Sequence, residues 1–223
     1  MSFLKLNKLL VSKDGKSAYS QGFHEGLNII RGHNSTGKST ISNFIFFALG
    51  GEFQDWLPEA ASCNYVVAEL EINGAIITVK RDIENIQMRP MSIYFGDLSK
   101  AMASNIAGWH IYPYRKTDKT ESFSQIIFKA LEFPEISTEN QESITVNQIL
   151  RLLYVDQLSS LDSLMRNEDF DSPLIRSAIG NLLLGTYNDN LLSLQIQLRQ
   201  KEKDYNEIKK QVKALEDVFD NSP

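Results

Sequence analysis

Short stretches of the chain carry the pattern of hydrophobic and polar positions that is typical of β-strands. Strands are expected at residues 3–11, 19–24, 27–31, 64–72, 75–81 and 91–95. Most of them alternate apolar and polar residues, whereas 27–31 is a short apolar run and is predicted to be a buried strand. Asn73-Gly74 is a two-residue turn that needs positive φ angles, so it favours a hairpin. The pattern predicts a β-meander from residue 64 onward.

A helix is predicted between the third and fourth of these strands, at residues 38–49. Its apolar residues recur at helical spacing on one face, at Ile41, Phe44, Ile45, Ala48 and Leu49. Gly50-Gly51 follows and is a stop signal. Residues 123–131 and 146–154 are expected to be helical or buried, and residues 96–109 show a mixed pattern.

The last part of the chain, residues 187–223, has a different pattern. Apolar residues follow one another at alternating steps of four and three, at Tyr187, Leu191, Leu194, Leu198, Tyr205, Ile208, Val212, Leu215 and Phe219. Lys201 is the one break in this heptad seam. Such a seam predicts a coiled-coil helix that projects from a globular domain at residues 1–186. A single helix cannot bury the seam, so a partner strand is required.

Between the strand at 27–31 and the helix at 38–49 stands the sequence GHNSTGKS, a complete P-loop of the form G-x-x-x-x-G-K-S. Successive backbone N–H groups of such a loop, together with the positive end of the following helix dipole, form an anion site. Lys38 is expected to reach the β- and γ-phosphates, and the Ser39 hydroxyl to bind Mg²⁺. The residues expected to bind ATP are Gly32, His33, Asn34, Ser35, Thr36, Gly37, Lys38, Ser39 and Thr40.

The composition of the chain indicates the broad class of protein but not a specific function. With 223 residues, 42% hydrophobic and 23% charged, the chain has the composition of a soluble globular protein. It has no apolar run long enough for a membrane span and no visible signal peptide. A single cysteine, Cys63, excludes an internal disulfide and fits a reducing cytoplasm. The net charge of -5 argues weakly against nucleic-acid binding, and the cluster Arg115, Lys116 and Lys119 is best interpreted as a solvated loop.

The order P-loop, β-meander and coiled coil resembles the SMC family, whose ABC-type ATPase head is split into two lobes joined by an antiparallel coiled coil. Residues 25–40 are similar to the start of such N-terminal lobes, and Asn34 matches the family's asparagine. Ser35-Thr36 departs from the commoner Gly-Ser and looks more like RecF-like and phage-defence ATPases. The resemblance implies an α/β P-loop NTPase fold, as an N-terminal half-head followed by a projecting coil.

A second match lies well downstream, at Gln157. The family has a Q-loop glutamine that binds Mg²⁺, so the resemblance implies that Gln157 shares the metal with Ser39 and joins Lys38 as a catalytic residue. Residues 176–189 resemble the helix and Leu-Gly turn from which the family's coil emerges. The Gly-Glu or Gly-Asp pair that usually follows the glutamine is missing, and Leu158-Ser159 stands in its place.

Two alternatives remain open for the same segment. Residues 152–156 are four apolar residues and an aspartate, the shape of a Walker B strand, in which Asp156 would hold Mg²⁺ through water. Gln157 could instead be an ordinary surface residue at a strand end.

No Leu-Ser-x-Gly-like signature motif and no apolar run ending in Asp-Glu is found in the chain, so it resembles half of a head. The resemblance implies a hydrolase whose partners are a C-terminal lobe in cis or in trans, a second head joined by ATP-dependent dimerisation, DNA, and a nuclease or other effector. Chromosome organisation, DNA repair and antiviral defence are the pathways compatible with it. The rival hypothesis is a self-contained P-loop NTPase or kinase with a dimerising coil.

Overall fold

The computed structural model describes all residues except 1, 85, 118, 135–143, 156–172 and 221–223. The fold is α/β, as expected, and is built on one six-stranded antiparallel sheet in the order β2-β1-β3-β4-β5-β6. The strands are β1 (Leu4–Lys13), β2 (Lys16–Gly22), β3 (Tyr65–Ile72), β4 (Ala75–Asp82), β5 (Met91–Tyr94) and β6 (His110–Tyr112).

The predicted meander is confirmed by β3, β4 and β5, which are neighbours in the sheet. The hairpin between β3 and β4 turns at Asn73 and Gly74, with φ angles of 48° and 83°. Both angles lie in the left-handed region that this two-residue turn requires. Residues 96–109, where the sequence pattern is mixed, contain two short helical elements. Strand β6 follows them.

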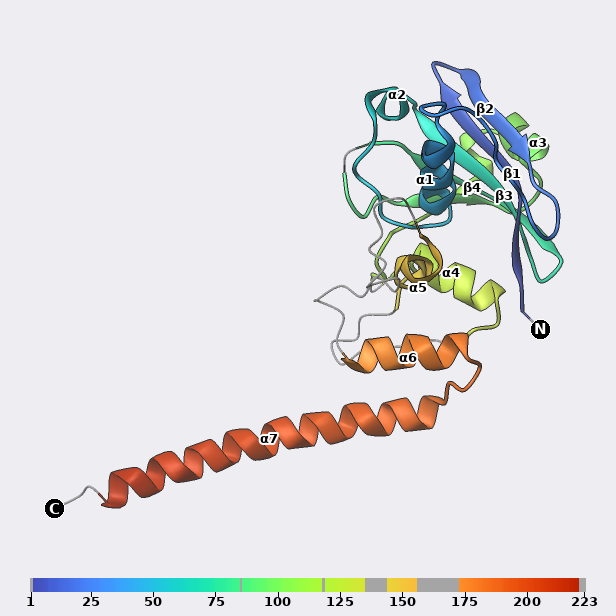
Figure 1. The fold of residues 1–223 in the computed structure, drawn as a ribbon. Coiled ribbons are helices and arrows are strands. Elements are labelled where there is room, and N and C mark those ends of the chain that lie inside the picture. The colour runs from blue at the N-terminus through green and yellow to red at the C-terminus, as the bar shows by residue number, and fades with distance from the viewer. Residues whose placement is uncertain (1, 85, 118, 135–143, 156–172, 221–223) are drawn as a thin grey trace.

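Helices lie on both faces and at one end of the sheet (Figure 1). They are α1 (Lys38–Ala48), α2 (Pro58–Ala61), α3 (Leu98–Ala103), the 3₁₀ turn η1 (Ile106–Gly108), α4 (Phe123–Ala130), α5 (Val146–Leu153), α6 (Pro173–Leu183) and α7 (Asp189–Asp220). The helix predicted at residues 38–49 is confirmed by α1, and residues 123–131 and 146–154, expected to be helical or buried, form α4 and α5. Each helix starts at the expected residue and ends one residue earlier. The Leu-Gly turn after α6 is also present, with Gly185 at φ 69°.

The hydrophobic core lies between one face of the sheet and α1, α4, α5 and α6. Buried residues from alternate positions of the central strands, such as Val66, Ala68 and Val79, belong to the same cluster as Phe44 and Phe47 of α1. The opposite face of the sheet is covered in part by α3, whose first N–H group, at Leu98, donates to the carboxylate of Glu69. The sheet therefore separates the P-loop helix from the α3 side.

One predicted strand is wrong. Residues 27–31 form no strand, and the side chains of Leu27 and Ile29 are 78% and 63% exposed. A strand needs a neighbour with free backbone groups and an apolar surface to cover it. In the part of the chain that the structure describes, no strand pairs with this segment, and Leu27 and Ile29 face solvent.

The C-terminal helix α7 has 32 residues and extends away from the sheet (Figure 1). The described seam residues on it are exposed, among them Leu194 at 61%, Leu198 at 60% and Ile208 at 59%. A long helix at this place is therefore confirmed, whereas its pairing into a coiled coil and the boundary at residue 187 stay predictions. None of the helices in the described residues has the length and apolar character that a membrane span needs.

Candidate nucleotide-binding site

The P-loop is a tight exposed turn that leads directly into α1. Ser35 and Gly37 have φ angles of 62° and 84°, so both residues adopt the left-handed backbone conformation. The Thr36 hydroxyl donates to the carbonyl oxygen of His33 at 2.8 Å and closes the turn from inside. A Cβ atom on Gly32 would lie 2.6 Å from that hydroxyl oxygen, so a larger residue here would require the Thr36 side chain to move.

Lys38 lies across the loop that precedes it. Its ammonium group donates to the carbonyl oxygens of Gly32, at 2.9 Å, and His33, at 2.5 Å. These are exposed backbone acceptors, which a phosphate oxygen can replace because it carries negative charge. The Lys38 ammonium therefore lies against the P-loop backbone, and its contact with phosphate stays a prediction.

The N-terminus of α1 is open to an anion. Gly37 is its N-cap and offers no side chain to its first N–H groups. In α1, which the structure describes throughout, the first turn holds no acidic residue that would compete with a phosphate. The helix dipole and the uncapped N–H groups both favour negative charge here.

The predicted contact residues lie together at this point. Residues 32–36 and Ser39 are exposed, and Gly37, Lys38 and Thr40 are half-buried. Ser39 lies in the first turn of α1, where the P-loop pattern predicts a ligand for a cation bound beside the phosphates. No group of three or more His, Cys, Asp or Glu side chains that could hold a metal ion occurs among the described residues.

The Asn28 side chain fixes the backbone of the segment that precedes the P-loop. Its side-chain oxygen accepts from the N–H group of His24 at 3.1 Å, and its amide donates to the carbonyl oxygens of His24 and Gly26 at 2.8 and 3.1 Å. These three bonds hold residues 24–28 as a closed turn. That turn explains locally why the chain is bent where the apolar pattern predicts a strand.

The opposite end of α1 is held by Arg81 of β4. Its side chain is 1% exposed, and one guanidinium nitrogen donates to the carbonyl oxygens of Phe47, at 3.1 Å, and Gly51, at 2.6 Å. The other terminal nitrogen pairs with the carboxylate of Glu52, and the guanidinium carbon lies 3.9 Å from the centroid of the Phe47 ring. A cation at a helix C-terminus also meets the negative end of its dipole.

Burial sets the electrostatics of this cluster. It lowers the pKa of Arg81, while the nearby charge of Glu52 acts in the opposite direction. Burial, with the Glu52 charge as the next cause, raises the pKa of Tyr114 to about 12. Glu52 is tied to α5 as well, because its N–H group donates to the side-chain oxygen of Asn147 at 2.9 Å.

The end of α5 lies beside α1. The Tyr154 hydroxyl donates to the side-chain oxygen of Asn43, and the Tyr154 ring lies 4.7 Å from the ring of Phe46, centroid to centroid. Asn43 is one helical turn beyond Ser39, so the chain leaves α5 close to the candidate metal ligand. Gln157 and Asp156 themselves lie outside the described residues.

The Walker B alternative is wrong for the segment that leads to Asp156. Residues 146–153 form a helix, and Tyr154 and Val155 belong to no strand. The capping box formed by Thr145 and Gln148 explains why the helix starts here, and its apolar face packs into the core. A Walker B aspartate stands at the end of a strand of the sheet, and here the sheet does not extend to this segment.

Arg81, Glu52 and Tyr154 are the residues that sequence reasoning missed. The sequence pattern could have identified Arg81, because this residue follows Ile77 and Val79 at alternate, core-facing positions of a strand. A charged residue at such a position needs a buried partner. Its partners on α1 and at Glu52 are distant in sequence, so the pattern alone could not identify them.

A comparison with protein families gives a match over most of the chain, to the model described as an AAA domain, at residues 22–220. The chain belongs to this AAA-domain family. It is a family of P-loop ATPase domains found in SMC-like and RecF-like proteins, which agrees with the resemblance found in the sequence. A search of curated proteins gives no match. AAA domains generally bind and hydrolyse ATP with Mg²⁺, and the P-loop described above is where this AAA domain would hold them.

Proposed function

We propose that the chain is the ATP-binding N-terminal lobe of an SMC-like ATPase head. The observation that carries the proposal is the P-loop itself, with Lys38 resting on loop carbonyl oxygens at the uncapped N-terminus of α1. Residues 32–40 would surround the phosphates, with Lys38 exchanging carbonyl oxygens for phosphate oxygens. Ser39 and Gln157 would hold Mg²⁺, which neutralises phosphate charge when bound.

The apolar segment before the P-loop supports the proposal that the chain is one of the two lobes of a head. Leu27 and Ile29 are exposed although they lie next to the nucleotide site. A C-terminal lobe, in cis or in trans, would cover them and supply the Walker B carboxylates and the signature motif. Hydrolysis would then require that lobe and a second head closed over the nucleotide.

Helix α7 supports the proposal that the chain forms one strand of a coiled coil. Its exposed apolar seam is unfavourable for an isolated helix in water, and an antiparallel strand from the other lobe would bury it. We expect a C-terminal lobe with its own coil, added in trans, to raise helicity and thermal stability together. No gain in either property on mixing would contradict the inferred partner strand.

ATP-driven closure of two such heads would act on DNA in the cytoplasm, with a nuclease or other effector as partner, in chromosome organisation, DNA repair or antiviral defence. The family found for the chain is compatible with each of these. DNA contacts would lie on the assembled head, because the chain alone has a net charge of -5.

ATP turnover by the purified monomeric chain tests the proposal. We expect saturable ATP binding with negligible hydrolysis, and hydrolysis above background once a C-terminal lobe is added. Robust turnover by the chain alone would contradict the half-head proposal and favour the self-contained NTPase with a dimerising coil.

The role of Gln157 needs the reconstituted head. Gln157→Ala should weaken ATP-driven dimerisation while the nucleotide affinity of the single lobe changes by no more than severalfold, since an amide oxygen suits Mg²⁺. Asp156→Ala is the matched control and should change neither property. Loss of Mg²⁺ dependence in Asp156→Ala alone would show that the Q-loop has been assigned to the wrong residue.

A further inference from the structure

Helix α7 turns its apolar seam away from the rest of the structure. Ile196 of α7 packs against the hydrophobic core, and its side chain is half-buried. This residue stands two positions from both Leu194 and Leu198, which is about 200° around the helix axis. Those two seam residues are exposed. The chain therefore holds α7 by the side opposite the seam, and a partner helix can approach the seam from solvent.

The seam of α7 is interrupted by one charged residue. Its described apolar and aromatic side chains are between 48% and 64% exposed, and they are Leu191, Leu194, Leu198, Tyr205, Ile208 and Val212. Lys201 lies three residues after Leu198 and four before Tyr205, which is the spacing of a seam position. A helix that covers the seam must therefore bring some group against the Lys201 ammonium.

The chain itself provides no such group. Among the residues that the structure describes, Lys201 has no hydrogen-bond or ion-pair partner. Glu202 is its direct neighbour in sequence, and adjacent residues of a helix do not face each other. Asp204 stands one turn further on, and its carboxylate accepts from the side-chain amide of Gln200 at 2.9 Å. The charge of Lys201 is thus available to a partner.

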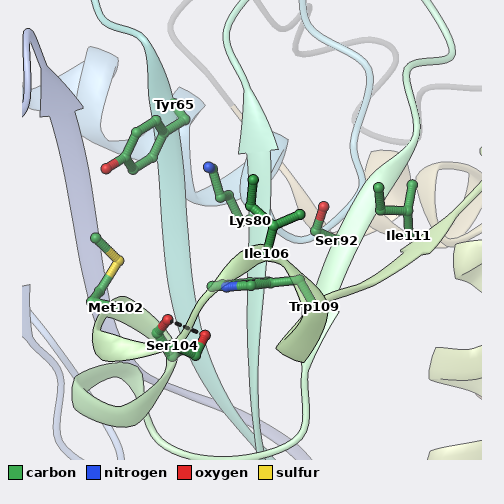
Figure 2. Close-up of a pocket in the computed structure, with 9 residues that line it drawn as sticks. Tyr65, Lys80, Ser92, Met102, Ser104, Ile106, Trp109 and Ile111 are labelled. Atoms are coloured by element: carbon green, nitrogen blue, oxygen red, sulfur yellow. Dashed lines mark hydrogen bonds between the residues drawn. The ribbon is translucent and has the colours of Figure 1, made fainter.

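A lysine on the sheet shows the contrasting case. Lys80 of β4 lines a hollow beside Trp109 and Ile111, and its ammonium nitrogen lies 4.2 Å from the centroid of the Tyr65 ring (Figure 2). A cation over an aromatic face is stabilised by the ring. Lys80 therefore has a partner within the chain, whereas Lys201 has none among the described residues.

A second copy of the chain is a poor partner for this seam. In a parallel pair with the same register, two Lys201 ammonium groups would meet in one layer and repel each other. In an antiparallel pair, Lys201 would face an apolar residue, because the seam contains no acidic residue. Burial of an ammonium group without an opposite charge is costly. Lys201 therefore disfavours pairing of α7 with itself.

We propose that the seam of α7 pairs with an antiparallel helix that differs from α7 and carries an acidic side chain opposite Lys201, with large aliphatic side chains in the neighbouring layers. The antiparallel direction rests on the proposed coil of the SMC-like head. A single polar seam position fixes the register of a coiled coil. Lys201 accordingly sets the register of this pair and excludes self-pairing.

The probe is a blocked fluorescent peptide of four heptads, titrated at low nanomolar concentration against the full chain by fluorescence anisotropy. Leucine occupies its seam positions except the fifth, which is glutamate and faces Lys201 in an antiparallel pair aligned with residues 191–215. Glutamine occupies the positions beside the seam. The matched peptide has its glutamate at the fourth seam position and leucine at the fifth, so composition and net charge are identical. We expect the first peptide to bind about tenfold more tightly.

Two variants separate the seam charge from the total charge. Lys201→Glu should reverse the preference between the peptides. Lys210→Glu, away from the seam, makes the same change in net charge and should leave the preference unchanged. Both lysines are exposed, so both variants should keep the fold.

The outcomes distinguish this proposal from the coil on which it rests. Equal binding of the two peptides, tighter binding of the matched peptide, or an unchanged preference in Lys201→Glu would overturn the role of Lys201 while a helix still pairs with the seam. Absence of binding by both peptides would overturn the proposal together with the coil.

Sedimentation of the wild-type chain alone tests a second copy as the partner. We expect a monomer at the concentrations at which the chain binds the first peptide. A dimer that Leu198→Glu dissociates would place a second copy on the seam and would overturn the proposal.

Discussion

The two ends of α1 are built in opposite ways. At the N-terminal end, the loop is exposed and the first N–H groups have no side-chain cap. The Lys38 ammonium group donates there to two exposed carbonyl oxygens. At the C-terminal end, the carbonyl oxygen of Phe47 is bound by the buried guanidinium of Arg81, which also pairs with Glu52. One end is left available for a ligand, while the other is fixed to the sheet.

The difference shows how a phosphate site can be both stable and adaptable. Buried hydrogen bonds at the C-terminal end hold the helix axis, so the positive end of the dipole points to a fixed place. Groups at the N-terminal end can then exchange partners without moving the helix. The comparison predicts that substitutions at the C-terminal end change folding stability and that substitutions at the N-terminal end change binding.

The largest effect on stability is expected for Arg81→Met. The substitution leaves two backbone carbonyl groups and the Glu52 carboxylate without their cation, and the free energy of unfolding should fall by about 3 kcal/mol in urea denaturation. The control is Lys5→Met, which removes a more exposed pair with Glu71 and should cost less than about 1 kcal/mol. Equal effects of the two substitutions would contradict the structural role of Arg81.

Alkaline pH should lower the free energy of unfolding through Tyr114, which lies near Arg81 and Glu52. The pKa of Tyr114 is about 12 in the folded chain, whereas an unfolded tyrosine has a pKa of about 10. Between these values the unfolded state loses the proton and the folded state keeps it, so the free energy of unfolding falls as pH rises. The loss should reach about 2 kcal/mol near pH 12. Tyr114→Phe should flatten this dependence, and Tyr205→Phe on exposed α7 should not.

Local sequence patterns predicted α1 and the hairpin at Asn73-Gly74 because turn chemistry and helical spacing act over a few residues. They failed at residues 27–31, where the apolar run is real but the pairing partner and covering surface are not in the described chain. The P-loop was recognisable for the same local reason, because its pattern lies within one short segment. The cluster around Arg81 was not, because its partners come from distant parts of the chain.

Tyr154→Phe should have a smaller effect on stability. It keeps the ring packed on Phe46 and removes the hydrogen bond to Asn43, so the free energy of unfolding should fall by about 1 kcal/mol. Thermal unfolding measures this, with Tyr154→Ala as the comparison that removes both contacts. A Tyr154→Phe chain as unstable as Tyr154→Ala would show that packing on α1 contributes little.

The smallest effect on stability is expected for Lys38→Ala. The two hydrogen bonds of Lys38 are exposed to solvent, where water replaces them at little cost, so the free energy of unfolding should change by less than about 1 kcal/mol. Urea denaturation beside Arg81→Met gives the contrast directly. A fall as large as that of Arg81→Met would mean that both ends of α1 are structural.

Binding of a fluorescent ATP analogue in the presence of Mg²⁺ tests the central claim most directly. The wild-type chain and Lys38→Ala are compared at a temperature at which both are folded, with Lys5→Met as a control for the loss of one positive charge. We expect saturable binding by the wild type and by Lys5→Met, and loss of binding in Lys38→Ala although the fold is intact. Absence of binding by the wild type, or equal binding by Lys38→Ala, would contradict the assignment of this loop as the nucleotide site.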